Sequence, residues 1–253
     1  AAGEVYAISD FDLASRLSFF IWGTVPDEEL IDLASRDELS NADVFDRQVW
    51  RMLADPRAEA LATRFATQWL RLQDLHKIDP DALAFPYYDN ILAEAMYRET
   101  ELLFDHLVRE DLPVTELLTA DYTFVNERLA RHYGIPGVSG SDFRKVSYPD
   151  DRRRGVLGHG SILTMTSHGN RTSPVLRGKW ILEVLLGSPP PPPPPNIPDL
   201  DETGDAADGR LLSVAEQMAM HRANPACSSC HNVIDPIGLS LDNFDVTGAW
   251  RIK

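Results

Sequence analysis

The chain has 253 residues and a formal net charge of −15, with 43% hydrophobic and 25% charged residues. This acidic balance argues against nucleic-acid binding, because a phosphate backbone would repel most of such a surface. No stretch approaches the roughly 20 apolar residues of a membrane span, and the length suits one large domain or two modest ones.

The first half of the chain predicts one helix after another. The clearest is 90–109, where Leu92, Met96, Leu103 and Leu107 recur at helical spacing on one face. A further helix over 123–133 is predicted to end at Gly134, a common stop signal. We therefore expect a mainly α fold with a helical domain at 1–145. The other helices predicted in this half cover 11–22, a segment from Pro26, 41–54 and a segment from Pro56.

A second, small helical domain is expected at 146–253. Residues 143–148 suit a short strand or an extended segment, and 155–166 suit a helix. Ser173-Pro174 caps a helix over 175–186. Seven prolines, Pro189–Pro195, lie in a proline-rich linker at 188–198. They predict polyproline II of about 22 Å, which is either a stiff spacer or a recognition segment for an aromatic groove. A last helix is expected over 211–222.

The strongest motif is Cys227-Ser228-Ser229-Cys230-His231, the C-x-x-C-H pattern of covalent haem attachment. Each thiol forms a thioether with the ring, and the histidine becomes an axial ligand of the iron. A thioredoxin-like redox pair would need a surrounding βαβ pattern, and a zinc site would need further ligands. The motif therefore predicts one haem c held by Cys227, Cys230 and His231.

The second axial ligand is expected upstream, because no Met or His follows His231. Our first choice is His168 in a polar turn, and Met165 is the second. An open iron position remains an alternative. Met218, Met220 and His221 precede the motif on the same helix, and their closeness in sequence favours packing beside the haem over capping its far face. His159 is a further option.

Charged residues and a turn are expected around the haem. Arg171 is predicted to pair with a haem propionate, because arginine binds carboxylates well. Arg177 and Lys179 either share that role or lie on a solvated helix face. Asp235-Pro236-Ile237-Gly238 is predicted to be a turn that brings the following apolar residues over the ring.

Several stretches together resemble the planctomycete-type cytochromes, multi-domain haem proteins of planctomycetes and myxobacteria built from domains of unknown function. The resemblance covers nearly the whole chain and implies a helical module followed by a haem-bearing module, but it implies no reaction. The matching stretches are Leu13–Ser18 with the following Phe-Ile-Trp, Met52–Arg57, Asp121–Asn126, Arg171–Val175 with Gly178–Trp180, the proline run, His221–Cys227, and Asp235-Pro236 with Asn243–Asp245 and Trp250-Arg251.

The function expected is that of a c-type cytochrome, an electron carrier rather than a catalyst. Covalent haem attachment of this type occurs outside the bacterial cytoplasm, so we expect a periplasmic or extracellular protein. The start Ala1-Ala2-Gly3-Glu4 has no signal-peptide pattern and no Met, which suggests a processed or partial chain. The acidic surface either suits a basic redox partner or serves solubility alone. The alternatives are a haem oxidoreductase subunit with an open iron site and a structural subunit of a larger assembly.

Overall fold

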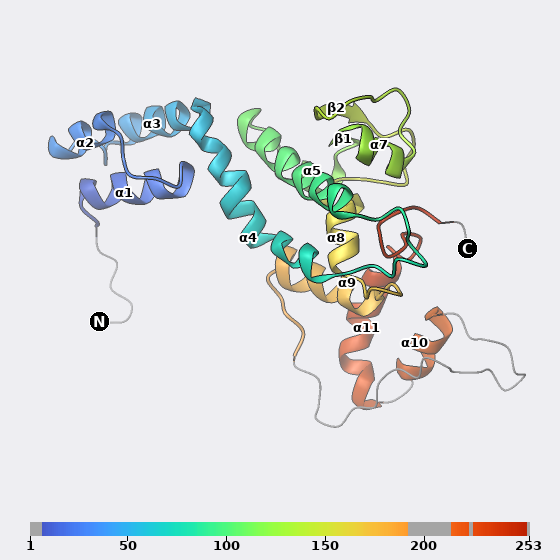
Figure 1. The fold of residues 1–253 in the computed structure, drawn as a ribbon. Helices are drawn as coiled ribbons and strands as arrows, with labels where there is room; N and C mark the ends of the chain where they lie inside the picture. Colours follow the sequence, from blue (N-terminus) through green and yellow to red (C-terminus); the bar gives the residue numbers. More distant parts are fainter. Residues whose placement is uncertain (1–6, 192–213, 223–224, 252–253) are drawn as a thin grey trace, which may run out of the picture.

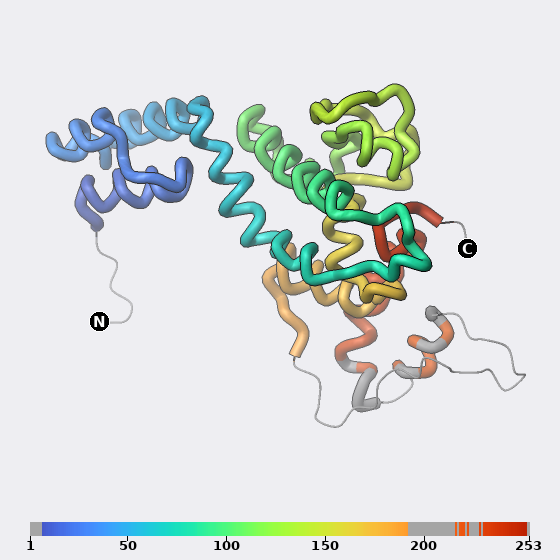
Figure 2. The backbone as a smooth tube through the Cα atoms, in the orientation of Figure 1, coloured from blue at the N-terminus to red at the C-terminus, as the bar shows by residue number. Residues whose placement is uncertain are grey.

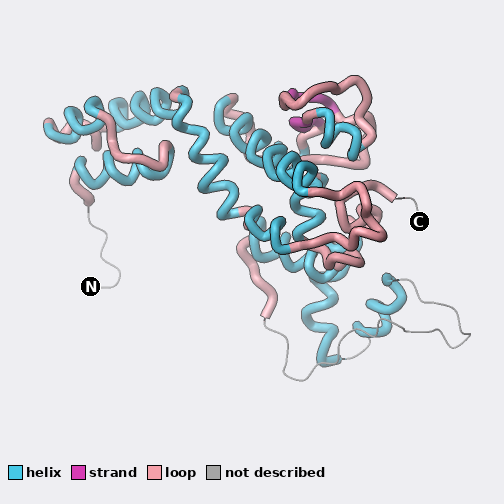
Figure 3. The backbone as a smooth tube through the Cα atoms, in the orientation of Figure 1, coloured by secondary structure: helices cyan, strands magenta, loops and turns pink. Residues whose placement is uncertain are grey.

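A computed structural model describes residues 7–191, 214–222 and 225–251, and its secondary structure is almost entirely helical (Figures 1 and 3). The prediction of a mainly α fold is confirmed. In these ranges no helix has both the length and the apolar character needed to cross a membrane. Most of the proline run, from Pro192 on, lies outside the described residues.

Three capped helices form the N-terminal end of the fold: α1 (Asp10–Ile21), α2 (Glu28–Ser35) and α3 (Ala42–Ala54). Side chains of Ser9, Asp27 and Asn41 accept hydrogen bonds from backbone N–H groups of the first turns, which explains where each helix begins. These helices enclose a small core, and the Trp22 indole donates to the Met52 carbonyl across it (2.9 Å). They lie together at one end of the molecule (Figure 1).

The segment expected to run from Pro56 as one helix changes helix type along its length. Its parts are η1 (Pro56–Glu59), the π-helical η2 (Leu61–Ala66), α4 (Thr67–Trp69) and η3 (Leu72–Lys77). Arg71 interrupts the helical path with a left-handed backbone, φ 58°. The long helix predicted at 90–109 is confirmed as α5 (Asn90–Arg109).

A two-stranded antiparallel sheet follows α5 and the short α6 (Glu116–Thr119). Strand β1 (Tyr122–Val125) pairs with β2 (Arg144–Ser147), with Tyr122 opposite Ser147. The helix predicted to start at Thr123 was wrong at its beginning: β-branched and aromatic residues form β1 instead. The helix α7 (Glu127–Tyr133) starts after Asn126, which caps it.

The C-terminal half adds further helices, and the predicted haem motif lies in the last of them, α11. These helices are η4 (Val156–Gly158), α8 (Gly160–Met165), α9 (Pro174–Trp180), the π-helical η5 (Ile181–Leu185), α10 (Val214–Arg222) and α11 (Pro225–Leu239). The turn predicted at residues 235–238 was wrong, because these residues continue α11 where it packs against α9.

The main hydrophobic core joins both halves of the chain. Leu72, Met96 and Leu103 pack in one cluster with Val156 and Trp180, which come from beyond residue 145. Two indoles strengthen this contact: Trp69 donates to the Val184 carbonyl (3.0 Å), and Trp180 donates to the Leu70 carbonyl (3.2 Å). The backbone trace shows α4 descending to the level of α9, where these bonds are made (Figure 2).

Candidate functional site

One face of α11 carries both the motif and the packing contacts of the helix. Cys227, Cys230 and His231 follow i, i+3, i+4 spacing, which places their backbone positions on one side of a helix. Ile234 and Gly238 continue the same face toward the C-terminal end, where α11 meets α9. Cys230 and His231 are half-buried, and the side chain of Cys227 lies outside the described part of the structure.

Two glycines let α9 and α11 approach to backbone contact. A Cβ at Gly178 would overlap the Ile234 carbonyl oxygen, and a Cβ at Gly238 would overlap the Pro174 carbonyl oxygen. Pro174 thus lies against Gly238 and Gly178 against Ile234, so the two helices run in opposite directions. The motif lies beyond this contact, toward the N-terminal end of α11.

His231 is oriented by a buried carboxylate one turn further along α11. Its Nδ1 lies 2.8 Å from Oδ1 of Asp235, whose side chain is completely buried. The other carboxylate oxygen, Oδ2, accepts from Nη1 of Arg222 at 3.0 Å. Arg222 is the last residue of α10, so this pair also joins α10 to α11.

The residues of α11 fit a covalently attached haem. A histidine that bonds through Nδ1 presents Nε2 to a metal, which is the usual arrangement of an oriented axial ligand. The two cysteine positions, one helical turn apart, precede that histidine on the same face. Within the described ranges, no group of three or more His, Cys, Asp or Glu is gathered in a way that suits a bare metal ion.

The predicted distal residue His168 and the predicted propionate partner Arg171 share one tight turn between α8 and α9. His168 N–H donates to the Arg171 carbonyl (2.9 Å), and a bridge between Ser167 and Thr172 closes the turn. Both side chains are exposed.

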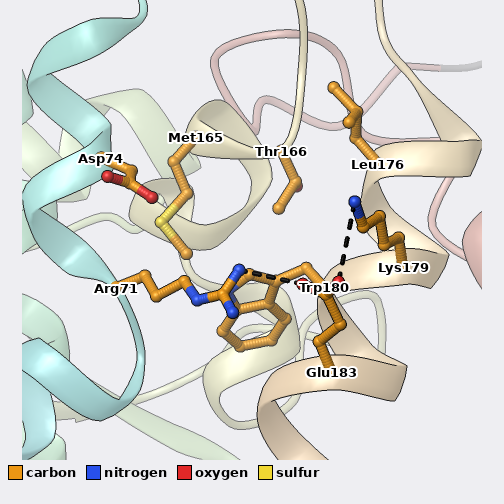
Figure 4. Close-up of a pocket in the computed structure, with 8 residues that line it drawn as sticks. All are labelled: Arg71, Asp74, Met165, Thr166, Leu176, Lys179, Trp180 and Glu183. Carbon is orange, nitrogen blue, oxygen red and sulfur yellow. Dashed lines mark hydrogen bonds and ion pairs between the residues drawn. The ribbon is translucent and has the colours of Figure 1, made fainter. Parts of the chain in front are cut away.

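Met165, the second distal choice, faces a different region. It lines a cavity of about 170 Å³, in which the thioether lies beside Arg71 and Asp74 (Figure 4). The cavity wall from α9 and η5 includes Leu176, Lys179 and Glu183. These positions lie on the face of α9 opposite Gly178, so α9 separates Met165 from α11.

The remaining axial candidates have different surroundings. Met218 of α10 is buried at 2% exposure, whereas Met220 is exposed. The side chain of His221 lies outside the described part. His159 is completely buried, with Nδ1 2.9 Å from the Thr100 hydroxyl of α5, and burial lowers its pKa to about 3.

Arg177 has a structural role that the sequence did not reveal. Its buried guanidinium donates to the carbonyls of Leu241 (2.6 Å), Phe244 (2.9 Å) and Asp245 (2.9 Å). Burial lowers its pKa to about 10, which leaves it charged at neutral pH. It therefore holds the C-terminal loop on α9 rather than a propionate, and Lys179 pairs with Glu183 (3.6 Å).

Glu99 is a buried ionisable residue that the sequence analysis did not single out. It is fully buried in α5 and accepts hydrogen bonds from Thr123 Oγ1 and Tyr133 Oη, each at 2.6 Å. Its Oε1 lies 3.8 Å from Nε2 of His159, and burial raises its pKa to about 7. The available signal was a glutamate on the apolar stripe of 90–109, between Met96 and Leu103.

Comparison with known protein families covers most of the chain. Residues 8–135 match the family described as PSD4, protein of unknown function (DUF1592). The chain belongs to the PSD4 family. Residues 153–253 of this PSD4 chain match a second family, described as PSCyt3, protein of unknown function (DUF1588), and both are domains of planctomycete-type cytochrome c families. No curated protein and no solved structure matches the chain.

The two matched segments are joined by buried polar contacts as well as by the core. Glu99, Thr100 and Tyr133 belong to the PSD4 segment, and His159 belongs to the PSCyt3 segment. Gly160 N–H also donates to Tyr133 Oη (2.6 Å). All of α8 to α11 lies within the PSCyt3 segment, including the C-x-x-C-H motif and Asp235.

Proposed function

We propose that this PSD4 chain is a c-type cytochrome that carries single electrons outside the cytoplasm. One haem c is bound through Cys227 and Cys230, with His231 as the proximal ligand. The observation that carries the proposal is the bond from His231 Nδ1 to buried Asp235, on the same helix as both cysteines. When bound, the haem supplies a one-electron ferric/ferrous couple.

The protein's own residues orient this group. Asp235 sets the ring plane of His231, and the contact between α9 and α11 holds the helix that carries it. His168 is proposed as the distal ligand. It is favoured over Met165 because Met165 lines a cavity on the far side of α9. Arg171, three residues after His168, is proposed to pair with a propionate.

Haem attachment bears on where the protein is located, and the acidic charge of the chain bears on its partner. Covalent haem attachment places the protein in the periplasm or outside the cell. With 39 acidic and 24 basic residues, the chain favours a redox partner that has a basic docking surface.

The first experiment measures haem attachment. Co-expression of the exported chain with a cytochrome c maturation system should give a protein with the mass of one covalent haem and a c-type reduced pyridine spectrum. Cys227→Ser with Cys230→Ser should lose the covalent haem, while His76→Ala, a change at an exposed histidine, should keep it. A wild-type chain without covalent haem after maturation would contradict the proposal.

The second experiment separates an electron carrier from an oxidoreductase. A carrier closed by His168 should show a six-coordinate, low-spin spectrum that carbon monoxide does not change. His168→Ala should open the iron to carbon monoxide, whereas Met165→Leu should not. Rapid carbon monoxide binding by the wild-type ferrous protein would favour the oxidoreductase alternative instead.

A further inference from the structure

The buried carboxylate of Asp235 interacts with two neighbouring side chains, His231 and Arg222. Its side chain is completely buried, so bulk water does not share that charge. Oδ1 meets His231 Nδ1 at 2.8 Å and Oδ2 meets Arg222 Nη1 at 3.0 Å. The effective dielectric constant in a protein interior is low, so both interactions are stronger than at the surface.

A histidine whose Nδ1–H donates to a carboxylate is a more basic ligand than one that donates to a neutral group. Electron density moves toward Nε2, and a more basic axial ligand stabilises ferric over ferrous iron. Arg222 opposes this effect, because it holds part of the same negative charge. The balance between Arg222 and His231 therefore sets how strongly the ligand donates.

We propose that Asp235 is a positioning residue that lowers the midpoint potential of the haem, and that Arg222 limits this effect. The proposal rests on the proposed function, since it needs His231 on the iron. The couple is a single electron exchanged with a partner protein, and the proton on Nδ1 stays between His231 and Asp235 in both states.

A purely structural role predicts something different. An i, i+4 pair between His231 and Asp235 also stabilises α11, and Arg222 also ties α10 to α11. Under that reading, both Asp235→Asn and Arg222→Gln would weaken folding or haem loading in the same direction. They would leave the iron–histidine bond as it is. An electronic role predicts shifts of opposite sign.

The test compares midpoint potentials of the loaded full chain at pH 8 for the wild type, Asp235→Asn and Arg222→Gln. Asp235→Asn should lower the ferric-to-ferrous ratio at a fixed potential about tenfold. For one electron this raises the midpoint potential by about 59 mV. Arg222→Gln should lower it. Asp105→Asn is the matched control, because it makes the same charge change at a half-buried residue of α5 that pairs with Arg109 instead.

Vibrational spectroscopy supplies a readout that a distant charge would not move. The iron–histidine stretch of the ferrous protein, measured on a variant opened at His168, should fall in frequency in Asp235→Asn and rise in Arg222→Gln. Asp105→Asn should leave it unchanged. Shifts of the same sign in both variants, or a stretch that does not move, would overturn the proposal.

Failure of this proposal is distinguishable from failure of the proposed function. A wild-type chain with no covalent haem overturns the proposed function. A loaded wild type whose potential and stretch are indifferent to Asp235 and Arg222 overturns only the tuning role. If Asp235→Asn does not load, Arg222→Gln carries the test alone, and an unchanged or raised potential there counts against the proposal.

Discussion

Glu99 of α5 and His159, which precedes α8, face each other 3.8 Å apart with both side chains fully buried. One comes from the PSD4 segment and the other from the PSCyt3 segment. Burial moves both pKa values toward the neutral forms, to about 7 for Glu99 and about 3 for His159. Burial at the junction between the two segments therefore favours the uncharged forms of both side chains.

Glu99→Gln should change how stability depends on pH. The folded-state pKa of Glu99 is raised from 4.5 to about 7, so its contribution is complete below pH 4.5 and is lost as the pH rises through 7. A shift of this size corresponds to about 3 kcal/mol of unfolding free energy. The variant cannot ionise at this position. Its unfolding free energy, relative to that of the wild type, should therefore rise by about that amount between pH 4.5 and pH 8.

The measurement is urea unfolding of both proteins across that range. His159 has the opposite linkage, because its lowered pKa costs stability as the pH falls below 6.5. That contribution arises only below pH 6.5, so the part of the difference gained between pH 6.5 and pH 8 reports Glu99 itself. Glu94→Gln, at an exposed site of the same helix, serves as control. A difference between Glu99→Gln and wild type that stays constant with pH would contradict the assignment.

Arg177→Met should destabilise the C-terminal loop. The guanidinium serves the carbonyls of Leu241, Phe244 and Asp245, which would be left without that donor. Buried acceptors that lose a partner cost about 1–3 kcal/mol each, and we expect a total loss of about 3 kcal/mol after relaxation. Thermal unfolding and proteolysis near residues 241–245 measure it. Lys179→Met, on the exposed side of α9, should change little, and equal effects would argue against this role.

Arg71 should show two opposing effects that substitution can separate. Its left-handed backbone costs about 1–2 kcal/mol for a non-glycine residue. Its side chain pairs with Glu183 at 2.9 Å, and both residues line the cavity (Figure 4). Arg71→Ala loses the pair and keeps the strain, whereas Arg71→Gly loses both. We expect Gly to be more stable than Ala by about 1 kcal/mol in urea unfolding, and the reverse order would refute the backbone argument.

Gly238→Ala should separate α11 from α9. The added methyl would meet the Pro174 carbonyl, and overpacking of this kind costs about 1–3 kcal/mol. Haem loading should fall with it, because the motif lies on the same helix. Asn232→Ala, on the exposed side of α11, is the matched change and should be tolerated. Normal stability and loading in Gly238→Ala would show that the close approach is unimportant.

Local patterns predicted those parts of the fold that depend on local interactions. The apolar spacing of 90–109 and the Ser173 cap are properties of short stretches, and they located α5 and the start of α9 correctly. The failures arose where distant residues decide the outcome. Tyr122–Val125 became a strand because Arg144–Ser147 pairs with it, and residues 235–238 stayed helical because α9 covers them.

The candidate site also contains residues that local spacing predicts and residues that depend on packing. Cys227, Cys230 and His231 form a motif that is recognisable from spacing alone. Asp235 was misread as part of a turn, although its distance of four residues from His231 is the helical signal for a paired side chain. The cavity around Met165 and the role of Arg177 depend on how α8, α9 and the C-terminal loop pack, which no local pattern contains.

The glycine contacts between α9 and α11 also allow only one register between the two helices. If α11 slid along α9 by a single residue, Ile237 or Leu239 would replace Gly238 opposite Pro174, where no side chain has room. Sliding by a whole turn would place Ile234 at the same point. The position of the C-x-x-C-H motif relative to α9 is therefore set by the absence of two methyl groups, at Gly178 and Gly238, rather than by the strength of any bond.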